Sequence, residues 1–144
     1  MFAIGLSNPK FSCNVGHVLR AADAYGATAV CVSGRRISAR AGTDVTQAYK
    51  RIPVLRGTDL RDMIPFNCVP VAIELSDKAE DLRTFEHPAH AFYIFGAEDA
   101  TLGEKTLSWC KKIVYVPTRI CMNLSACANV VLYDRIAKLG LESR

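Results

Sequence analysis

Apolar segments rich in β-branched residues alternate with helix-like segments along almost the whole of the 144-residue chain. This alternation constrains the fold more than any other feature, because strands that alternate with helices build parallel sheets covered on both faces. Strands buried on both faces read as continuous apolar runs, and several of these segments do so. The sequence therefore predicts an α/β domain with a mainly parallel sheet and helices on both faces.

The expected elements follow from apolar runs and from the capping and stop residues at their ends. Asn14 is a plausible N-cap of a helix that Gly26 stops, and Thr58 is a candidate cap further along. Pro53 cannot donate a ladder hydrogen bond, so its segment is expected at a sheet edge. The expected strands are 2–6, 29–33, 52–55, 69–75, 91–95 and 113–116, and the expected helices are 14–25, 58–64, 104–110 and 122–139.

Length and composition limit the class of protein. A chain of 144 residues fits one domain, 1–144, with a core that needs no disulfides. The cysteines form no C-x-x-C pair, so reduced, buried thiols and no metal site are expected. No apolar run reaches the roughly 20 residues of a membrane span, and the first residues do not resemble a signal peptide, so the expected location is the cytoplasm. The net charge of +4 permits a polyanionic partner without requiring one.

Two segments each allow two interpretations. Residues 33–43 are the most basic stretch, with Arg35, Arg36 and Arg40, and either contact phosphates or form a solvated loop. The helix 122–139 is apolar nearly all round through its first turns, so it is buried either against a partner subunit or against the sheet of its own chain.

Three loops that follow predicted strands carry the glycine and small polar residues typical of a ligand site. An α/β sheet usually binds ligands beyond the carboxyl ends of its strands. The three segments are 8–20, 95–103 and 116–125. Each also has a simpler interpretation: Arg20 pairs with Asp23 on the helix surface. Glu98 favours the dipole of the helix that follows it, and Asn123 only caps the last helix.

In this order and spacing, the three segments resemble the motifs of the SPOUT superfamily of RNA methyltransferases, in particular its ribose 2′-O branch, the SpoU/TrmH type. The first motif, N-x-G-x-x-x-R, stands at residues 14–20, and the second, F-G-x-E-x-x-G-L, at residues 95–102. The third, a proline step followed by S-[LM]-N-[VL]-S, stands at residues 116–117 and 121–125. The resemblance covers nearly the whole chain.

The resemblance implies a C-terminal segment threaded into a deep trefoil knot, which no periodicity argument would predict. The knot region would hold the cofactor S-adenosyl-L-methionine, largely through backbone groups. By position, the residues implied to line it are Gly96, Val116, Cys121 and Leu124, with Ile73 as a weaker candidate. The family works as a homodimer, which favours a partner subunit as the cover of the last helix. Its substrate is RNA, with tRNA favoured here and rRNA possible.

The implied reaction is methyl transfer to a ribose 2′-hydroxyl by in-line displacement at a sulfonium methyl, which needs no metal because the thioether leaves uncharged. The family assigns Arg20 to activating the hydroxyl, and in the dimer Arg20 is implied to serve the neighbouring subunit's cofactor. A guanidinium keeps its proton at physiological pH, so we interpret Arg20 as a charged donor to developing oxyanion charge or to the adjacent phosphate. Asn14, Glu98 and Asn123 would shape the loops and orient donors.

Two rival hypotheses stand beside this one. Ala97, Thr101 and Cys121 depart from the motifs and favour a dimeric RNA-binding or assembly module of the same fold that has lost its cofactor. A thiol hydrolase that uses Cys13 and His17 is the weaker rival, because no third orienting group is visible.

Overall fold

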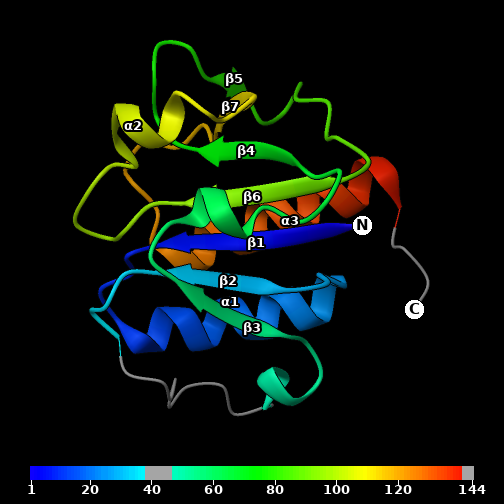
Figure 1. Ribbon diagram of the computed structural model, residues 1–144. Helices are drawn as coiled ribbons and strands as arrows, with labels where there is room; N and C mark the ends of the chain where they lie inside the picture. Colours follow the sequence, from blue (N-terminus) through cyan, green and yellow to red (C-terminus); the bar gives the residue numbers. More distant parts are fainter. Residues whose placement is uncertain (38–46, 141–144) are drawn as a thin grey trace.

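A computed structural model describes residues 1–37 and 47–140. Within these residues, seven strands form one sheet in the order β3-β2-β1-β6-β4-β7-β5, and every pairing is parallel (Figure 1). The strands are β1 (Phe2–Ser7), β2 (Val30–Ser33), β3 (Val54–Gly57), β4 (Val69–Ile73), β5 (Glu80–Asp81), β6 (Ala91–Phe95) and β7 (Lys112–Tyr115). The helices are α1 (Ser12–Tyr25), α2 (Gly103–Leu107) and α3 (Leu124–Leu139), with 3₁₀ helices η1 (Ala48–Lys50) and η2 (Leu60–Met63). The predicted α/β fold with a mainly parallel sheet is confirmed.

The helix predicted over 58–64 is wrong in type and in length. Only the 3₁₀ helix η2 forms there, and its N-cap is Asp59 rather than Thr58, since the Asp59 carboxylate accepts the Arg61 N–H at 2.9 Å. Pro65 disfavours helical backbone at the residue before it, and Ile64 is extended. The strand β5 and the helix η1 have no counterpart among the predicted elements.

Helix α1 begins earlier than predicted but ends where predicted. Its N-cap is Phe11, which supplies no side-chain cap, so Asn14 lies inside the first turn and is not the cap. Gly26 ends the helix with φ 81°, a left-handed conformation that costs glycine least.

The two faces of the sheet are covered unequally. α1 and α3 lie side by side on one face, over the larger hydrophobic cluster (Figure 1). η2 and the segment around α2 cover a smaller cluster on the other face, which includes Leu60. In β6, Tyr93 belongs to the first cluster, whereas Phe92 and Ile94 belong to the second, as the alternation of side chains along a strand requires.

Helix α3 is partly buried within its own chain. Leu124, Val131 and Leu132 are buried, while Val130 and Tyr133 remain exposed, the latter to 62%. The sheet therefore covers one face of α3, and a partner subunit for the other face stays a prediction, as does the knot. None of the helices in the described part of the chain combines the length and the apolar character that a membrane crossing requires.

The expectation of buried thiols is correct for some cysteines only. Cys31 and Cys68 are buried, and burial raises the pKa of the Cys31 thiol to about 11. Cys13 and Cys121 are exposed. The exposed pair lie in the first and third motif segments, at the ends of elements where the core does not reach.

A buried polar network ties α3 to the segment before β6. The His87 ring, whose side chain is 0% exposed, lies 2.6 Å from the Tyr93 hydroxyl and 2.8 Å from the Asp134 carboxylate. The Arg135 guanidinium donates to the Tyr93 hydroxyl at 3.1 Å. That hydroxyl is therefore free to donate to His87 Nδ1, which leaves Nε2–H to donate to Asp134, so the network fits a neutral imidazole.

We expect this network to make the protein less stable as the pH falls below about 6.5. Burial lowers the pKa of His87 from its ordinary 6.5, although Asp134 opposes the shift. The unfolded chain then takes up a proton on His87 at a higher pH than the folded chain does. The free energy of unfolding therefore decreases as the pH falls below the His87 pKa of the unfolded chain, and it is fully retained above that pH. Urea midpoints at several pH values should fall less steeply in His87→Gln than in the wild type. His90→Gln, at an exposed histidine, should keep the wild-type slope.

Candidate active site

The carboxyl ends of three neighbouring strands bring the predicted cofactor residues to one edge of the sheet. Ile73, the last residue of β4, pairs with Phe95 in β6 and with Val114 in β7. Gly96 follows Phe95 directly, and Val116 follows one residue after the end of β7. The register alone therefore places Ile73, Gly96 and Val116 beside one another, at the edge where parallel sheets bind ligands.

Glu98 joins the first and second motif segments. Its carboxylate accepts hydrogen bonds from the Asn14 amide at 2.6 Å, from the Lys10 N–H at 2.7 Å and from the Phe11 N–H at 3.3 Å. Glu98 thereby ties the N-cap residue Phe11 and its neighbour Lys10, which precede α1, to the second motif loop. The interpretation of Glu98 as a partner of the helix that follows it is wrong, because the carboxylate stands at the start of α1.

The third motif segment reaches the same group. Asn123 donates its amide to Asn14 Oδ1 at 3.5 Å, and its own oxygen accepts the Ala126 N–H at 2.8 Å and the Ser125 hydroxyl at 3.0 Å. Asn123 is thus the N-cap of α3, as the simpler interpretation holds, and it also contacts the first motif. Asn14, Glu98 and Asn123 form one hydrogen-bonded group, which we call the motif triad.

The motif triad keeps its carboxylate ionised. Burial raises the pKa of Glu98, but the hydrogen bonds from the Asn14 side chain and from the Lys10 and Phe11 N–H groups outweigh that effect and hold the pKa below its ordinary value. A carboxylate that accepts several N–H donors is stabilised in its charged form. The triad therefore orients loops and is not a proton donor near neutral pH.

Glu98→Ala is expected to lower the free energy of unfolding by about 1–3 kcal/mol, because it leaves the buried Asn14 amide and two backbone N–H groups without an acceptor. Glu98→Gln keeps an acceptor oxygen and should lose less. Glu104→Ala removes an exposed acid of α2 and should change stability by less than about 0.5 kcal/mol. Urea unfolding of the three variants checks the order, and equal midpoints for Glu98→Ala and Glu104→Ala would contradict it.

Two further contacts at this edge have no signal in the motifs. Glu74, the residue after β4, accepts the Leu102 N–H at 2.8 Å and so holds the second motif loop against β4. Arg36 donates to both oxygens of Asp99, at 3.0 and 2.8 Å, which keeps the pKa of Asp99 well below its usual range. In the basic stretch 33–43, Arg36 is therefore paired with Asp99 and is not simply solvated. Arg40 lies outside the described residues.

In the loop between β7 and α3, the Ile120 carbonyl accepts the Thr118 hydroxyl at 2.7 Å, but several backbone N–H groups lack a backbone acceptor among the described residues. In the described structure, the N–H groups of residues 118–122 donate to no backbone carbonyl. Cys121 is exposed in this loop, Val116 at its start is half-buried, and Leu124 at its end is buried. A Cβ on Gly96 would lie 3.2 Å from the Ala100 carbonyl oxygen, so a larger residue there would displace the neighbouring loop.

These features fit a ligand held mainly by main-chain groups. Adjacent strand ends provide the floor, the free N–H groups provide donors, and Ile73, Val116 and Leu124 provide apolar contacts. Across residues 1–37 and 47–140, no three His, Cys, Asp or Glu side chains gather in a way that could hold a metal ion.

Arg20 is the predicted site residue that one chain does not bring to this edge. It lies on α1, about 9 Å along the helix axis from Asn14, and it is exposed whereas Asn14 is buried. The suggested pair with Asp23 is wrong, because Asp23 accepts the Arg51 guanidinium at 2.8 Å instead. Arg20 makes no hydrogen bond or ion pair with any residue that the structure describes.

Comparisons with known proteins identify the family of the chain. Residues 1–133 match the model of the SpoU rRNA Methylase family. Over 143 residues the chain is 27% identical to a protein of Staphylococcus aureus (strain COL) assigned to the TrmH family of tRNA/rRNA methyltransferases, covering 93% of this chain and 56% of that protein. The chain thus spans little more than half the length of such curated relatives.

Two solved structures share the fold. The AdoMet-bound rRNA methyltransferase from Sinorhizobium meliloti matches with a TM-score of 0.83 at 20% identity, over 96% of this chain and 56% of that chain. A protein studied for 2-OH methylation of C/U34 on tRNA matches with a TM-score of 0.79 at 17% identity, over 96% of both chains.

Proposed function

We propose, from the premise that the chain belongs to the SpoU rRNA methylase family, that it transfers a methyl group from S-adenosyl-L-methionine to a ribose 2′-hydroxyl of RNA. One observation carries the proposal: the three motif segments, far apart in the sequence, meet through the hydrogen bonds of Asn14, Glu98 and Asn123. A scattered arrangement of these segments would leave no site of this kind.

The edge of β4, β6 and β7 would hold the cofactor. Ile73, Val116 and Leu124 offer apolar contacts, and Gly96 and Cys121 offer main-chain groups from the two loops. When bound, S-adenosyl-L-methionine supplies an electrophilic methyl group whose thioether leaves uncharged, so the reaction needs no metal to stabilise the leaving group.

Arg20 would act on the hydroxyl as a charged hydrogen-bond donor. A guanidinium cannot serve as a base at physiological pH, but it stabilises negative charge as it develops on the ribose oxygen and it binds phosphate, while the hydroxyl proton passes to phosphate or water. Its place on α1, away from the edge of its own chain, supports a homodimer in which Arg20 serves the partner's cofactor site. The exposed Val130 and Tyr133 of α3 support the same arrangement.

The substrate we favour is tRNA in the cytoplasm, with rRNA as the alternative. One protein of the same fold was studied for 2-OH methylation of C/U34 on tRNA, which supports tRNA, and another is an rRNA methyltransferase, which keeps rRNA as the alternative. The net charge of +4 suits either polyanion.

The proposal is tested by incubating the protein with S-adenosyl-L-methionine labelled in its methyl group and with total tRNA or total rRNA. A 2′-O-methyl group removes the hydroxyl that attacks the neighbouring phosphodiester in alkali, so label should remain in alkali-resistant dinucleotides. Label released as single nucleotides would identify a base methyltransferase instead.

Calorimetric titration with S-adenosyl-L-methionine separates the enzyme from an inactive module of the same fold. The substitutions at Ala97, Thr101 and Cys121 favour such a module, which would release no heat of binding. The enzyme proposed here binds the cofactor with one site per chain.

A further inference from the structure

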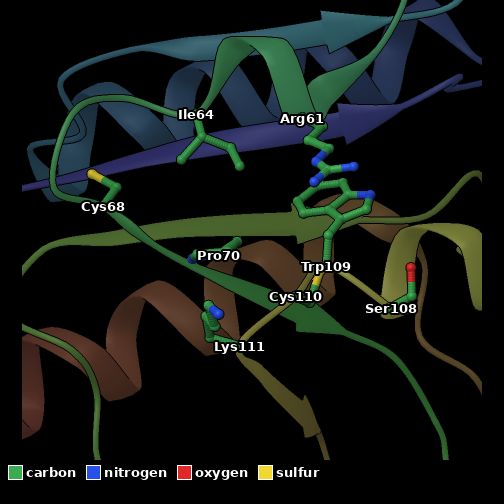
Figure 2. Close-up of a pocket in the computed structure, with 8 residues that line it drawn as sticks. All are labelled: Arg61, Ile64, Cys68, Pro70, Ser108, Trp109, Cys110 and Lys111. Carbon is green, nitrogen blue, oxygen red and sulfur yellow. The ribbon is translucent and has the colours of Figure 1, made fainter.

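Two depressions adjoin on the face of the sheet that carries η2 and α2. One, of about 440 Å³, lies over the beginnings of β4 and β7 and is lined by Arg61, Trp109 and Lys111 (Figure 2). The other, of about 170 Å³, extends to the carboxyl ends of β1 and β2 and is lined by Lys105 and again by Trp109. Because Trp109 lines both, the two depressions adjoin at its side chain, and together we call them the Trp109 groove.

The groove is basic and carries an aromatic ring at its middle. Its charged lining residues are Arg61, Lys105 and Lys111, against a single acid, Asp59, whose carboxylate already accepts the Arg61 N–H. Figure 2 shows the Arg61 side chain pointing toward the Trp109 ring. A planar ring flanked by cations matches the base and the phosphates of a nucleotide.

Three donor groups of the groove have no partners among the residues that the structure describes. The Arg61 guanidinium, the Lys111 ammonium and the Trp109 indole N–H form no hydrogen bond or ion pair with the residues that the structure describes. Arg36, by contrast, is paired with Asp99. The groove therefore presents donors that a phosphate or a base edge can satisfy without breaking an existing contact.

The groove leads toward the candidate active site. Ser33 lines its end, and the Ser33 carbonyl accepts the Asn8 N–H at 3.1 Å. Asn8 begins the loop whose next residues, Lys10 and Phe11, donate to Glu98. An extended nucleic-acid strand in the groove would therefore run from the beginnings of β4 and β7 to the loop that carries the first motif.

We propose that the Trp109 groove binds a single-stranded segment of the substrate RNA, with one base stacked on Trp109 and neighbouring phosphates on Arg61, Lys105 and Lys111. The inference rests on the proposed function, because it assumes that RNA is the substrate. It adds an RNA contact on the face opposite α1 and α3, where a second subunit is not expected. The groove sets RNA affinity and contributes nothing to the transfer step.

The test uses the fluorescence of Trp109, the single tryptophan of the chain. A single-stranded oligoadenylate of about ten nucleotides should quench it, because a stacked base quenches an indole, and the quenching should weaken as salt is added. A duplex of the same length should quench far less. No quenching at concentrations where fluorescence anisotropy of a labelled oligonucleotide shows binding would overturn the proposal, as would equal quenching by free adenosine monophosphate.

Variants extend the test to the RNA substrate. Trp109→Ala should weaken RNA binding roughly 5- to 100-fold, and Trp109→Phe should retain part of the affinity. Lys111→Ala should lower the salt dependence of binding by about one counterion, whereas Lys78→Ala, an exposed lysine outside the groove, should not. Trp109→Phe and Lys111→Ala remain informative if the alanine variant at Trp109 unfolds.

The outcome for the groove is separable from the outcome for the proposed function. The groove variants should raise KM for RNA while kcat and cofactor affinity stay at the wild-type level. A wild-type protein that methylates RNA, together with groove variants of unchanged KM, would overturn the groove and leave the function intact. A wild-type protein that transfers no methyl group would overturn the function itself.

Discussion

Arg20→Ala is expected to lower kcat for methyl transfer by roughly 100- to 1000-fold, the range found when one donor to a developing oxyanion is removed. Affinity for S-adenosyl-L-methionine should stay unchanged, because Arg20 is exposed on α1, away from the strand ends that would hold the cofactor. Stability should change by less than about 0.5 kcal/mol, since Arg20 has no partner among the described residues. Single-turnover assays and calorimetry measure the two quantities separately.

Arg20→Lys is the matched variant for the proposed role. It keeps the positive charge but loses the planar fork of donors, so its activity should lie between those of the wild type and the alanine variant. Equal turnover by wild type and Arg20→Ala on a true substrate RNA would refute the assignment.

A mixing experiment tests whether Arg20 acts across two subunits. Gly96→Val should disable the cofactor loop, because even a Cβ at that position would lie 3.2 Å from the Ala100 carbonyl oxygen. Arg20→Ala and Gly96→Val are each expected to have little activity alone. In a mixed dimer, one site combines an intact Arg20 with an intact cofactor loop of the other chain, so activity should partly return on mixing. No recovery in mixed dimers would place Arg20 in the site of its own chain.

Arg135→Ala is expected to lower the free energy of unfolding by about 3–5 kcal/mol. Arg135 is 2% exposed and donates to the carbonyls of Pro88 and Ala89, at 2.7 and 2.8 Å, and to the Tyr93 hydroxyl. The guanidinium also lies 5.0 Å from the centre of the Phe2 ring, so its removal leaves a cavity in addition to the loss of hydrogen bonds. We expect the urea midpoint to fall while the slope of the free energy of unfolding against urea concentration stays unchanged.

Arg83→Ala is the matched control, because it also removes an arginine. The Arg83 side chain is 76% exposed and its pair with Asp81 lies at the surface, so the expected loss is at most about 1 kcal/mol. Similar losses for the two variants would contradict the view that the buried network around His87 anchors α3.

The sequence predicts the meeting of the motif loops because parallel strands end at a common edge. The apolar runs before Gly96 and Val116 are recognisable as strands in the sequence. That they end at one edge of the sheet follows from the α/β pattern. The structure then brings Asn14, Glu98 and Asn123 into one bonded group. The helix predicted at 58–64 fails for a reason that the sequence does contain, since Pro65 shortens it.

Other features depend on tertiary contacts that no local pattern encodes. Glu74 and the Arg36–Asp99 pair join segments separated by 28 and 63 positions, and neither shows a spacing signal. The segment before α1 is held by Glu98, whose distant carboxylate accepts the N–H groups of Lys10 and Phe11, and Asn14 lies inside the helix rather than at its cap. The proposed place of Arg20 opposite the partner's cofactor would depend on a second subunit, which the sequence of one chain does not display.

Mass-spectrometric mapping of ribose methylation in RNA, from cells with and without the gene, tests the central claim most directly. The account predicts that one 2′-O-methylnucleotide disappears from a tRNA or an rRNA when the gene is removed. It should return with the wild-type gene and stay absent with Arg20→Ala. An unchanged set of ribose methyl groups, or the loss of a methyl group from a base, would contradict the account.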